Sequence, residues 1–264
     1  MDLLLKDKVA LVCGASQGIG YSVAAEISRE GAKVIICSRN EERIHMAAQQ
    51  IETETGRPVV AFRTDLAEKA DIESLAETAL GLYGRLDILV NNTGGPPPGF
   101  YHELDYEQWM AAYKSTCMSA IHLSSLILPG MKKNHWGRII NLTSLTVKQP
   151  IHNLILSNSI RMGVIGWAKT IALEYAPYGV TVNNIATGYT STERMQEIIK
   201  KRMVAEAISE TEALSSIVNH IPMKRMARPE EIAYLVTFLV SPKADYITGT
   251  TMSIDGGVVQ YTLA

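Results

Sequence analysis

Cysteine is scarce in this sequence, whose 264 residues include only Cys13, Cys37 and Cys117. Three is an odd number, and two of these cysteines lie inside apolar runs, which is typical of buried thiols in a reducing compartment. A disulfide framework is therefore excluded as the main source of stability. The chain has to rely on a hydrophobic core, and with 47% hydrophobic residues it is apolar enough to form a sizeable one.

An excess of charge of one sign is also missing. Lysine and arginine number 25 against 27 acidic residues, so the formal net charge is −2. This balance excludes the strong long-range field that draws basic proteins to nucleic acid or to anionic lipid.

Long hydrophobic runs are missing as well. The amino-terminal "MDLLLKDK" has three leucines before charged residues return, which is too few for a signal peptide. The longest uncharged run, 115–131, contains several serines and ends near Pro129-Gly130, so we interpret it as a buried helix and not as a membrane span. We therefore expect a cytoplasmic protein without a nucleic-acid or membrane partner.

What the sequence does contain is a regular alternation of short β-branched runs and amphipathic helical segments. The runs are apolar at nearly consecutive positions, as in strands covered on both faces. Alternation along the whole length predicts an α/β fold with one parallel sheet of about seven strands, and without a composition break we expect residues 1–264 to form a single domain. The expected strands span 8–13, 32–37, 58–62, 86–91, 137–142, 180–185 and 251–254.

One region interrupts this alternation. Residues 190–229 contain amphipathic sequence but no strand pattern. An insertion of this length at the carboxyl edge of a sheet is a candidate lid over a ligand, and the alternative is a helix pair that packs on the surface. We favour the lid.

A glycine-rich turn follows the first expected strand. In "CGASQGIG", Gly14, Gly18 and Gly20 precede a helix. Glycine at these positions permits a tight turn and lets backbone N–H groups approach a pyrophosphate at the helix amino terminus. A strand before the turn and a helix after it favour a Rossmann-type, doubly wound dinucleotide-binding sheet over an ordinary tight turn.

The end of the second strand bears on the choice of dinucleotide. The sequence there is Ser38-Arg39-Asn40, where a site for the unphosphorylated cofactor usually has a carboxylate. An arginine suits a 2′-phosphate through charge-assisted hydrogen bonds, so we expect NADP(H) in preference to NAD(H). Asp65 after the third strand is a candidate acceptor for the adenine amino group, and Asn91 ends the fourth strand where the backbone passes close to the cofactor.

Together these motifs resemble the short-chain dehydrogenase/reductase family, and the chain is similar to its beta-ketoacyl-carrier-protein reductases over nearly its whole length. Besides the glycine motif, the family's Asn-Asn-x-Gly motif is matched at 91–94, its strand-five motif by "NLTS" at 141–144, and its later motif by "VNNIATG" at 182–188. The terminal "DGG" stands at 255–257. The resemblance implies hydride transfer with a nicotinamide cofactor and a homodimer or homotetramer.

The resemblance also implies a catalytic serine, tyrosine, lysine and asparagine, and here only the serine is present, as Ser144. The spacing places Ser157 at the position of the proton-donating tyrosine, Arg161 at that of the lysine, and Thr116 at that of the asparagine. A serine hydroxyl is a weak general acid, and arginine stays charged and does not relay protons. Ser144 and Ser157 can still donate hydrogen bonds to a carbonyl oxygen, and Arg161 can stabilise an alkoxide or enolate.

Three interpretations remain open from the sequence. In the first, the protein is a carbonyl reductase whose proton comes from water or another side chain, with Lys148, His152 and Tyr189 as candidates. In the second, it reduces an activated alkene such as an enoyl thioester, so that water can protonate the enolate later. In the third, the fold is kept for nucleotide binding or oligomerisation without catalysis. We favour an enzyme, because the cofactor loop and Ser144 are retained, although fold alone does not decide function.

We therefore predict an NADP(H)-dependent oxidoreductase that acts on a small carbonyl or enoyl compound, with Ser144, Ser157 and Arg161 as the catalytic residues and no residue assigned to a metal. The residues assigned to the cofactor are Gly14, Ser16, Gln17, Gly18, Ile19, Gly20, Ser38, Arg39, Asn40, Asp65, Leu66, Asn91, Thr93, Gly94, Arg161, Gly188, Thr190 and Thr192.

Overall fold

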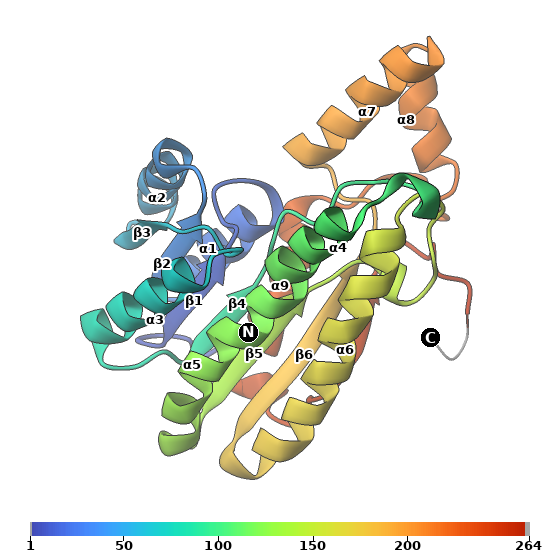
Figure 1. Cartoon of the computed structure of the whole chain (residues 1–264). Coiled ribbons are helices and arrows are strands. Elements are labelled where there is room, and N and C mark those ends of the chain that lie inside the picture. Colours follow the sequence, from blue (N-terminus) through green and yellow to red (C-terminus); the bar gives the residue numbers. More distant parts are fainter. Residues whose placement is uncertain (1, 262–264) are drawn as a thin grey trace.

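A parallel sheet forms the centre of the molecule in the computed structural model, which describes residues 2–261 (Figure 1). Within these residues the sheet has seven strands in the order β3-β2-β1-β4-β5-β6-β7, and every neighbouring pair is parallel. The strands are β1 (Val9–Cys13), β2 (Lys33–Ser38), β3 (Val59–Arg63), β4 (Ile88–Asn91), β5 (Gly137–Leu142), β6 (Val180–Thr187) and β7 (Thr251–Ile254). The predicted seven-stranded Rossmann-type sheet is confirmed, with strand ends within two residues of those expected.

The strands form because they can be buried on both faces. All five residues of β1 and all six of β5 are buried, which agrees with the consecutive apolar positions of β1, and in β5 the buried residues include Arg138 and Asn141. Strand β3 at the edge of the sheet is only partly buried. The three cysteines are buried and unpaired, as expected from the sequence.

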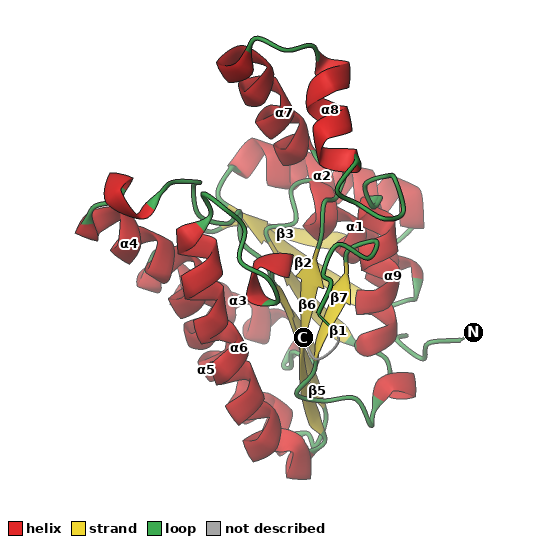
Figure 2. Cartoon of the chain, turned by 90° about the vertical axis from the view of Figure 1, so that its right-hand side faces the viewer, coloured by secondary structure: helices red, strands yellow, loops and turns green. Residues whose placement is uncertain are grey.

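Helices cover both faces of the sheet (Figure 2). Helices α1, α2 and α9 contribute to the hydrophobic core on one face, and α3, α5 and α6 to the core on the other. No helix in the described part of the chain is long and apolar enough to cross a membrane. The helices are α1 (Gly18–Arg29), α2 (Glu41–Thr55), α3 (Lys69–Tyr83), α4 (Tyr106–Tyr113), α5 (Ser119–Lys133), α6 (Ile155–Tyr175), α7 (Glu193–Glu206), α8 (Glu210–Val218) and α9 (Pro229–Leu239).

The uncharged run 115–131 is helical, as expected. Helix α5 continues through Pro129 to Lys133. Proline removes one backbone donor and can be carried by a helix whose packing compensates for it. Ile127, Leu128 and Met131 on either side of Pro129 are buried in the core, which accounts for the continuation.

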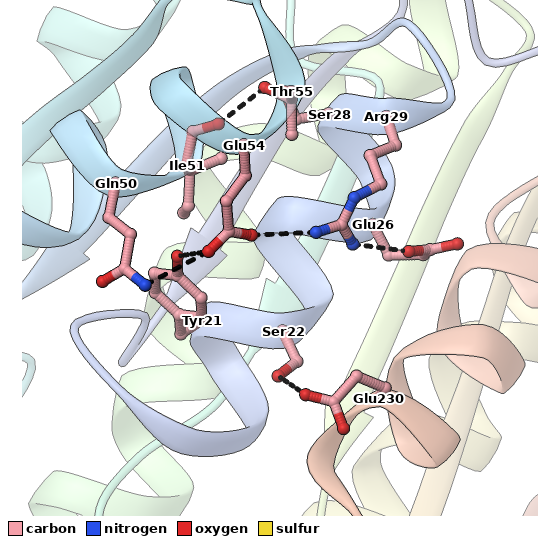
Figure 3. Close-up of polar contacts among 10 residues, drawn as sticks. All are labelled: Tyr21, Ser22, Glu26, Ser28, Arg29, Gln50, Ile51, Glu54, Thr55 and Glu230. Atoms are coloured by element: carbon pink, nitrogen blue, oxygen red, sulfur yellow. Dashed lines mark hydrogen bonds and ion pairs between the residues drawn. The ribbon is translucent and has the colours of Figure 1, made fainter.

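A polar network ties α1 to its neighbours (Figure 3). Glu54 on α2 accepts a hydrogen bond from the Tyr21 hydroxyl at 2.7 Å and pairs with Arg29 at 2.8 Å. On the other side of α1, the Ser22 hydroxyl donates to Glu230 of α9 at 3.4 Å. These contacts fix the helix whose amino terminus faces the glycine-rich turn.

The strand order reverses between β1 and β4, which are neighbours although β2 and β3 lie between them in the chain. Ligands of doubly wound sheets bind outside the carboxyl ends of the strands at such a switch point. The two strand ends are held together here, since the Asn92 side chain donates to the Gly14 carbonyl at 3.1 Å.

The region 190–229 is helical, as its amphipathic sequence predicts. Helices α7 and α8 extend beyond the carboxyl edge of the sheet (Figure 1) and pack on each other through Ile199, Ala213 and Ile217. Two backbone hydrogen bonds close the base of the insertion, from the Ser191 N–H to the Ala227 carbonyl at 2.8 Å and from the Ala227 N–H to the Tyr189 carbonyl at 2.9 Å. The insertion is therefore a helical hairpin whose base is joined to the sheet edge, and a lid function stays a prediction.

Candidate active site

The glycine-rich turn leaves the first turn of α1 open to a ligand. Gly18 has a φ of +61°, and a Cβ on Gly20 would lie 2.3 Å from the Gly14 carbonyl oxygen, so a side chain at either position would be strained or would clash. Gln17 precedes the helix without capping it through its side chain. The first backbone N–H groups of α1 thus keep their capacity to bind an anion. Ser16 and Ile19 lie in the same turn, half-buried.

At the end of β2, the predicted cofactor residues divide into two kinds. The Ser38 hydroxyl donates to the Asn40 carbonyl at 3.3 Å, and the Asn40 side chain caps α2 by accepting from the Arg43 N–H at 2.8 Å. These two side chains have structural partners. Arg39 is exposed and, within the described residues, has no ion pair, so its guanidinium is available to a 2′-phosphate.

Arg43 is a residue that the sequence analysis missed. It lies in the first turn of α2, and its Nη1 donates to Gln17 Oε1 of the glycine-rich turn at 3.3 Å. A second guanidinium therefore lies on the Arg39 side of the cofactor turn. Arg43 lies four residues after Arg39 and directly after two glutamates, so the sequence did not distinguish it from an ordinary charged residue on a helix surface.

Asn91 lies in a buried row of asparagines that crosses the sheet. Its side-chain amide donates to Asn141 Oδ1 at 2.9 Å and to the Ser124 hydroxyl at 3.2 Å, and Asn141 donates to Asn184 at 2.8 Å. The three asparagines are in register on β4, β5 and β6. The side-chain amide of Asn91 is thus already hydrogen-bonded within the protein. The predicted contact of Asn91 with the cofactor therefore depends on its backbone at the end of β4.

A small pocket lies beside these strand ends. Leu66, Asn91 and Thr93 line it together with Thr116 and Arg161. Asp65, next to Leu66, accepts a hydrogen bond from the Ala67 N–H at 3.0 Å through one carboxylate oxygen. Predicted cofactor residues from the ends of β3 and β4 therefore line one pocket together with Arg161 of α6.

The segment after β6 lies against the glycine-rich turn. A Cβ built on Gly18 would be 3.2 Å from the Thr192 methyl carbon, while the Thr192 hydroxyl caps α7 through the Met195 N–H at 3.4 Å. Thr190 donates to the Gly188 carbonyl at 3.3 Å. Of the predicted cofactor residues in this segment, Thr192 thus lies against the glycine-rich turn.

Ser144 and Ser157 are joined by a residue that the sequence analysis missed, Thr146. The Ser144 hydroxyl oxygen accepts from the Thr146 N–H at 3.2 Å, and the Thr146 and Ser157 hydroxyl oxygens are 3.0 Å apart. Because Ser144 only accepts in this arrangement, its O–H is free to donate to a substrate oxygen. Thr146 follows Ser144 by two residues, but it belongs to none of the motifs that drew attention to this region.

Arg161 lies one helical turn after Ser157 on α6 and is buried. Its Nη1 donates to the Leu142 carbonyl at 3.1 Å, whereas its buried Nε has no hydrogen-bond partner among residues 2–261. Burial, with a further contribution from the nearby Arg194 charge, lowers the pKa of Arg161 to about 10. The group is still a cation at neutral pH, so it supplies fixed positive charge in a poorly solvated place.

The candidate proton donors occupy different surroundings. His152 packs against the Phe100 ring, with ring centroids 5.0 Å apart, and Tyr189 packs with the α7–α8 hairpin core. Lys148 is half-buried and directly follows the short helical turn after Ser144. Thr116, in a π-helical turn between α4 and α5, has a buried hydroxyl without a partner and lines the pocket. Of these four, Thr116 is the one that lines the pocket with Arg161.

Within residues 2–261, no group of three or more His, Cys, Asp and Glu side chains is arranged to hold a metal ion.

Comparison with known proteins gives the family. A model of the family described as Enoyl-(Acyl carrier protein) reductase matches residues 14–259, which is most of the chain. The chain belongs to this family of short-chain dehydrogenases/reductases. The expected resemblance is thereby confirmed.

Two curated relatives are similar over almost their full length. The 3-oxoacyl-[acyl-carrier-protein] reductase of Haemophilus influenzae is 32% identical over 254 residues, which cover 96% of this chain and 99% of the relative. The NADPH-dependent reductase BacG of Bacillus subtilis is 31% identical over 254 residues, covering 96% of this chain and 98% of the relative.

A solved structure is similar in three dimensions. L-Sorbose reductase from Gluconobacter frateurii, complexed with NADPH and L-sorbose, superposes with a TM-score of 0.95 at 30% identity. The match covers 99% of this chain and 100% of that one. Both BacG and the sorbose reductase are thus NADPH proteins, which agrees with the cofactor expected from Arg39.

Proposed function

We propose that this short-chain dehydrogenase/reductase is an NADPH-dependent enzyme that transfers hydride to or from a small carbonyl or enoyl compound, acyl thioesters included. The observation that carries the proposal is the meeting of two features at one edge of the sheet. An open glycine-rich turn at the β1–β4 switch point adjoins a pocket that contains the buried Arg161 guanidinium. The NADPH named for the relatives supports the same cofactor here.

The residues present fit this cofactor. The uncapped first turn of α1 would bind the pyrophosphate, and Arg39, with Arg43 beside it, would bind the 2′-phosphate. Thr190 and Thr192 lie where the cofactor would pass between the turn and α7. When bound, NADPH supplies the hydride.

The residues around the reacting oxygen supply stabilisation. The Ser144 hydroxyl donates a hydrogen bond to the oxygen, and Thr146 orients both serines. Arg161 provides a positive charge that is already fixed and desolvated, so it favours the alkoxide or enolate without reorganisation. None of these three groups is an acid suited to neutral pH, and we therefore assign protonation to water.

The activated-alkene reaction is the second candidate, and Ser157 favours it. Its hydroxyl is buried and bonded to Thr146 in the position where the family has a proton-donating tyrosine. An enolate can leave the site and be protonated in water, whereas an alkoxide has to be protonated as it forms. The alkene reaction thus depends less on the missing tyrosine.

We also propose that α7 and α8 act as a lid and that the protein forms homodimers or homotetramers in the cytoplasm. Arg194 at the start of α7 donates to the carbonyls of Gly95 and Pro96, each at 3.3 Å. These bonds connect the hairpin with the loop that contains Gly95 and Pro96. Helix α6 exposes Met162 and Leu173, and exposed apolar side chains suit a self-association surface. Buried, unpaired cysteines fit a reducing compartment.

A nucleotide titration followed by a substrate screen tests the proposal. NADPH and NADH are titrated by nicotinamide fluorescence, and we expect micromolar or tighter binding of NADPH. NADPH oxidation is then measured with ketones, keto-thioesters and enoyl-thioesters, and Arg161→Met should cut turnover by at least 100-fold while NADPH affinity changes by less than about threefold. Unchanged turnover would remove Arg161 from the mechanism, and absence of nucleotide binding would favour a non-catalytic protein.

A further inference from the structure

Two arginines from distant parts of the chain approach the same point. Arg161 comes from α6 and Arg194 from the first turn of α7. A Cβ built on Gly95 would lie 3.1 Å from Arg161 Nη2 and 3.5 Å from both terminal nitrogens of Arg194. The loop after β4 thus passes directly beside two guanidinium groups, and its residue there is a glycine with a φ of +65°.

Neither guanidinium has a carboxylate partner within residues 2–261, where the ion pairs of the structure lie elsewhere. Arg161 donates to the Leu142 carbonyl, and its Nε is buried without any partner. Arg194 donates only to the neutral carbonyls of Gly95 and Pro96, both at 3.3 Å, which is long for a charged donor.

This arrangement is electrostatically unfavourable in the protein alone. Burial and mutual repulsion lower the pKa of Arg161, and burial lowers that of Arg194, where Glu197 on the next turn opposes the effect. Arg161 is buried, whereas Arg194 remains exposed to solvent along part of its side chain. Two neighbouring like charges of this kind are retained in a protein when a ligand of opposite charge completes the site. A carboxylate accepts hydrogen bonds from such forks with matching planar geometry.

We propose that Arg161 and Arg194 together bind the carboxylate of the substrate, which makes the substrate an oxo acid or an unsaturated carboxylic acid and not a neutral ketone or sugar. The proposal rests on the proposed function, since it names the substrate class of the same site. Arg161 extends from the helix that carries Ser157, so the carboxylate lies close to the oxygen-stabilising hydroxyls. Arg194 reaches the site from the hairpin, so that an acidic substrate also draws α7 onto the Gly95–Pro96 loop.

The other anion available to the pair is a phosphate of the cofactor. The uncapped amino terminus of α1 already offers donors for the pyrophosphate, and Arg39 lies at the end of β2 for the 2′-phosphate. The cofactor phosphates therefore do not require Arg161 and Arg194, which favours the substrate as the ligand of these two arginines. Because Thr192, close to Arg194, touches the glycine-rich turn, the experiment has to separate the two sources.

The test measures binding without turnover. The full-length protein is saturated with NADP⁺, which cannot reduce a ketone, and thermal shifts are recorded with 2-oxobutanoate, acetoacetate and levulinate, each paired with its methyl ester. These acids place the carboxylate at increasing distance from the ketone. We expect at least one acid to bind tenfold or more tightly than its ester, because the ester has no carboxylate to accept charge-assisted hydrogen bonds from the guanidinium groups.

Variants identify the binding residue. Arg194→Gln should abolish the preference for the acid and leave NADP⁺ affinity within about twofold, and Arg194→Lys should restore part of the preference. Arg202→Gln is the matched control, since Arg202 lies on the same helix and pairs with Glu206 away from the site; its acid and NADP⁺ affinities should match those of the wild type.

Several outcomes would overturn the proposal. Equal binding of acids and esters, or no binding of any acid, would show that the pair does not recognise a carboxylate. A tenfold loss of NADP⁺ affinity in Arg194→Gln would assign the pair to a cofactor phosphate. If no nucleotide binds, the proposed function fails by itself, and the acid–ester comparison repeated without nucleotide still tests the arginine pair.

Discussion

Replacing Arg161 with methionine should make the protein without ligands more stable, although the residue is central to the proposed site. Arg161 is a base whose pKa falls on folding from its ordinary value to about 10, chiefly because the group is buried. A lowered pKa means that the unfolded chain binds more protons between these two values, so stability rises with pH across that window. Below about pH 10 the group is charged in both states, and its full cost is present.

The size of this cost follows from the shift. A pKa lowered to about 10 corresponds to roughly 3 kcal/mol of unfavourable free energy at neutral pH, at about 1.4 kcal/mol for each tenfold change in proton affinity. Methionine removes the charge but also the hydrogen bond to the Leu142 carbonyl, which contributes about 1 kcal/mol. We therefore expect a net gain of about 2 kcal/mol in the free energy of unfolding, or about 4–8 °C in Tm.

Urea unfolding at pH 7.5, without nucleotide and at equal protein concentration, measures this gain. Arg161→Lys is the control, because a lysine keeps a buried charge and should not produce the stabilisation. If Arg161→Met is as stable as the wild type or less stable, the charge is already balanced in the free protein. The inference of an unfilled anion site would then lose its electrostatic basis.

Two further predictions concern the cofactor turn and the sheet. Arg39→Ala should weaken NADPH binding by about tenfold or more and NADH binding by less than twofold, because only NADPH has the 2′-phosphate; equal losses in fluorescence titrations would contradict the assignment. Asn141→Ala should lower the free energy of unfolding by about 2–4 kcal/mol, since it removes the buried partners of Asn91 and Asn184 together. A loss below about 1 kcal/mol in urea unfolding would show that the asparagine row contributes little.

The fold could be predicted from the sequence because its signals are local. Residues 9–13 are apolar at consecutive positions, which is typical of a strand buried on both faces, and 137–142 has a shorter apolar run at Ile139 and Ile140. The glycine-rich turn is equally local, since strand, turn and helix follow one another between Val9 and Arg29. Helix α5 shows the limit of such signals, because it continues through Pro129 to Lys133, where buried neighbours compensate for the proline.

The site was less predictable because its parts meet through the fold. Motif spacing identified Ser144, Ser157 and Arg161, but Arg194 is 33 residues beyond Arg161 in an insertion without a pattern. Its approach to Gly95 depends on how the hairpin joins the sheet edge. Arg43 likewise gains its importance only from its contact with Gln17.

The substitutions in the catalytic positions change what the site is able to do. A tyrosine–lysine pair exchanges protons, whereas a serine bonded to a threonine and a buried arginine provide only fixed hydrogen bonds and fixed charge. A buried fixed charge such as that of Arg161 lowers the stability of the protein without ligand. Such a loss of stability is typical of functional sites and is recovered when the ligand binds. A substrate that brings its own negative charge removes the cost of Arg161 and Arg194 on binding and still leaves the serine hydroxyls for the reacting oxygen. The departures from the family pattern are thus consistent with a change of substrate and of proton source, and they do not require the loss of hydride transfer.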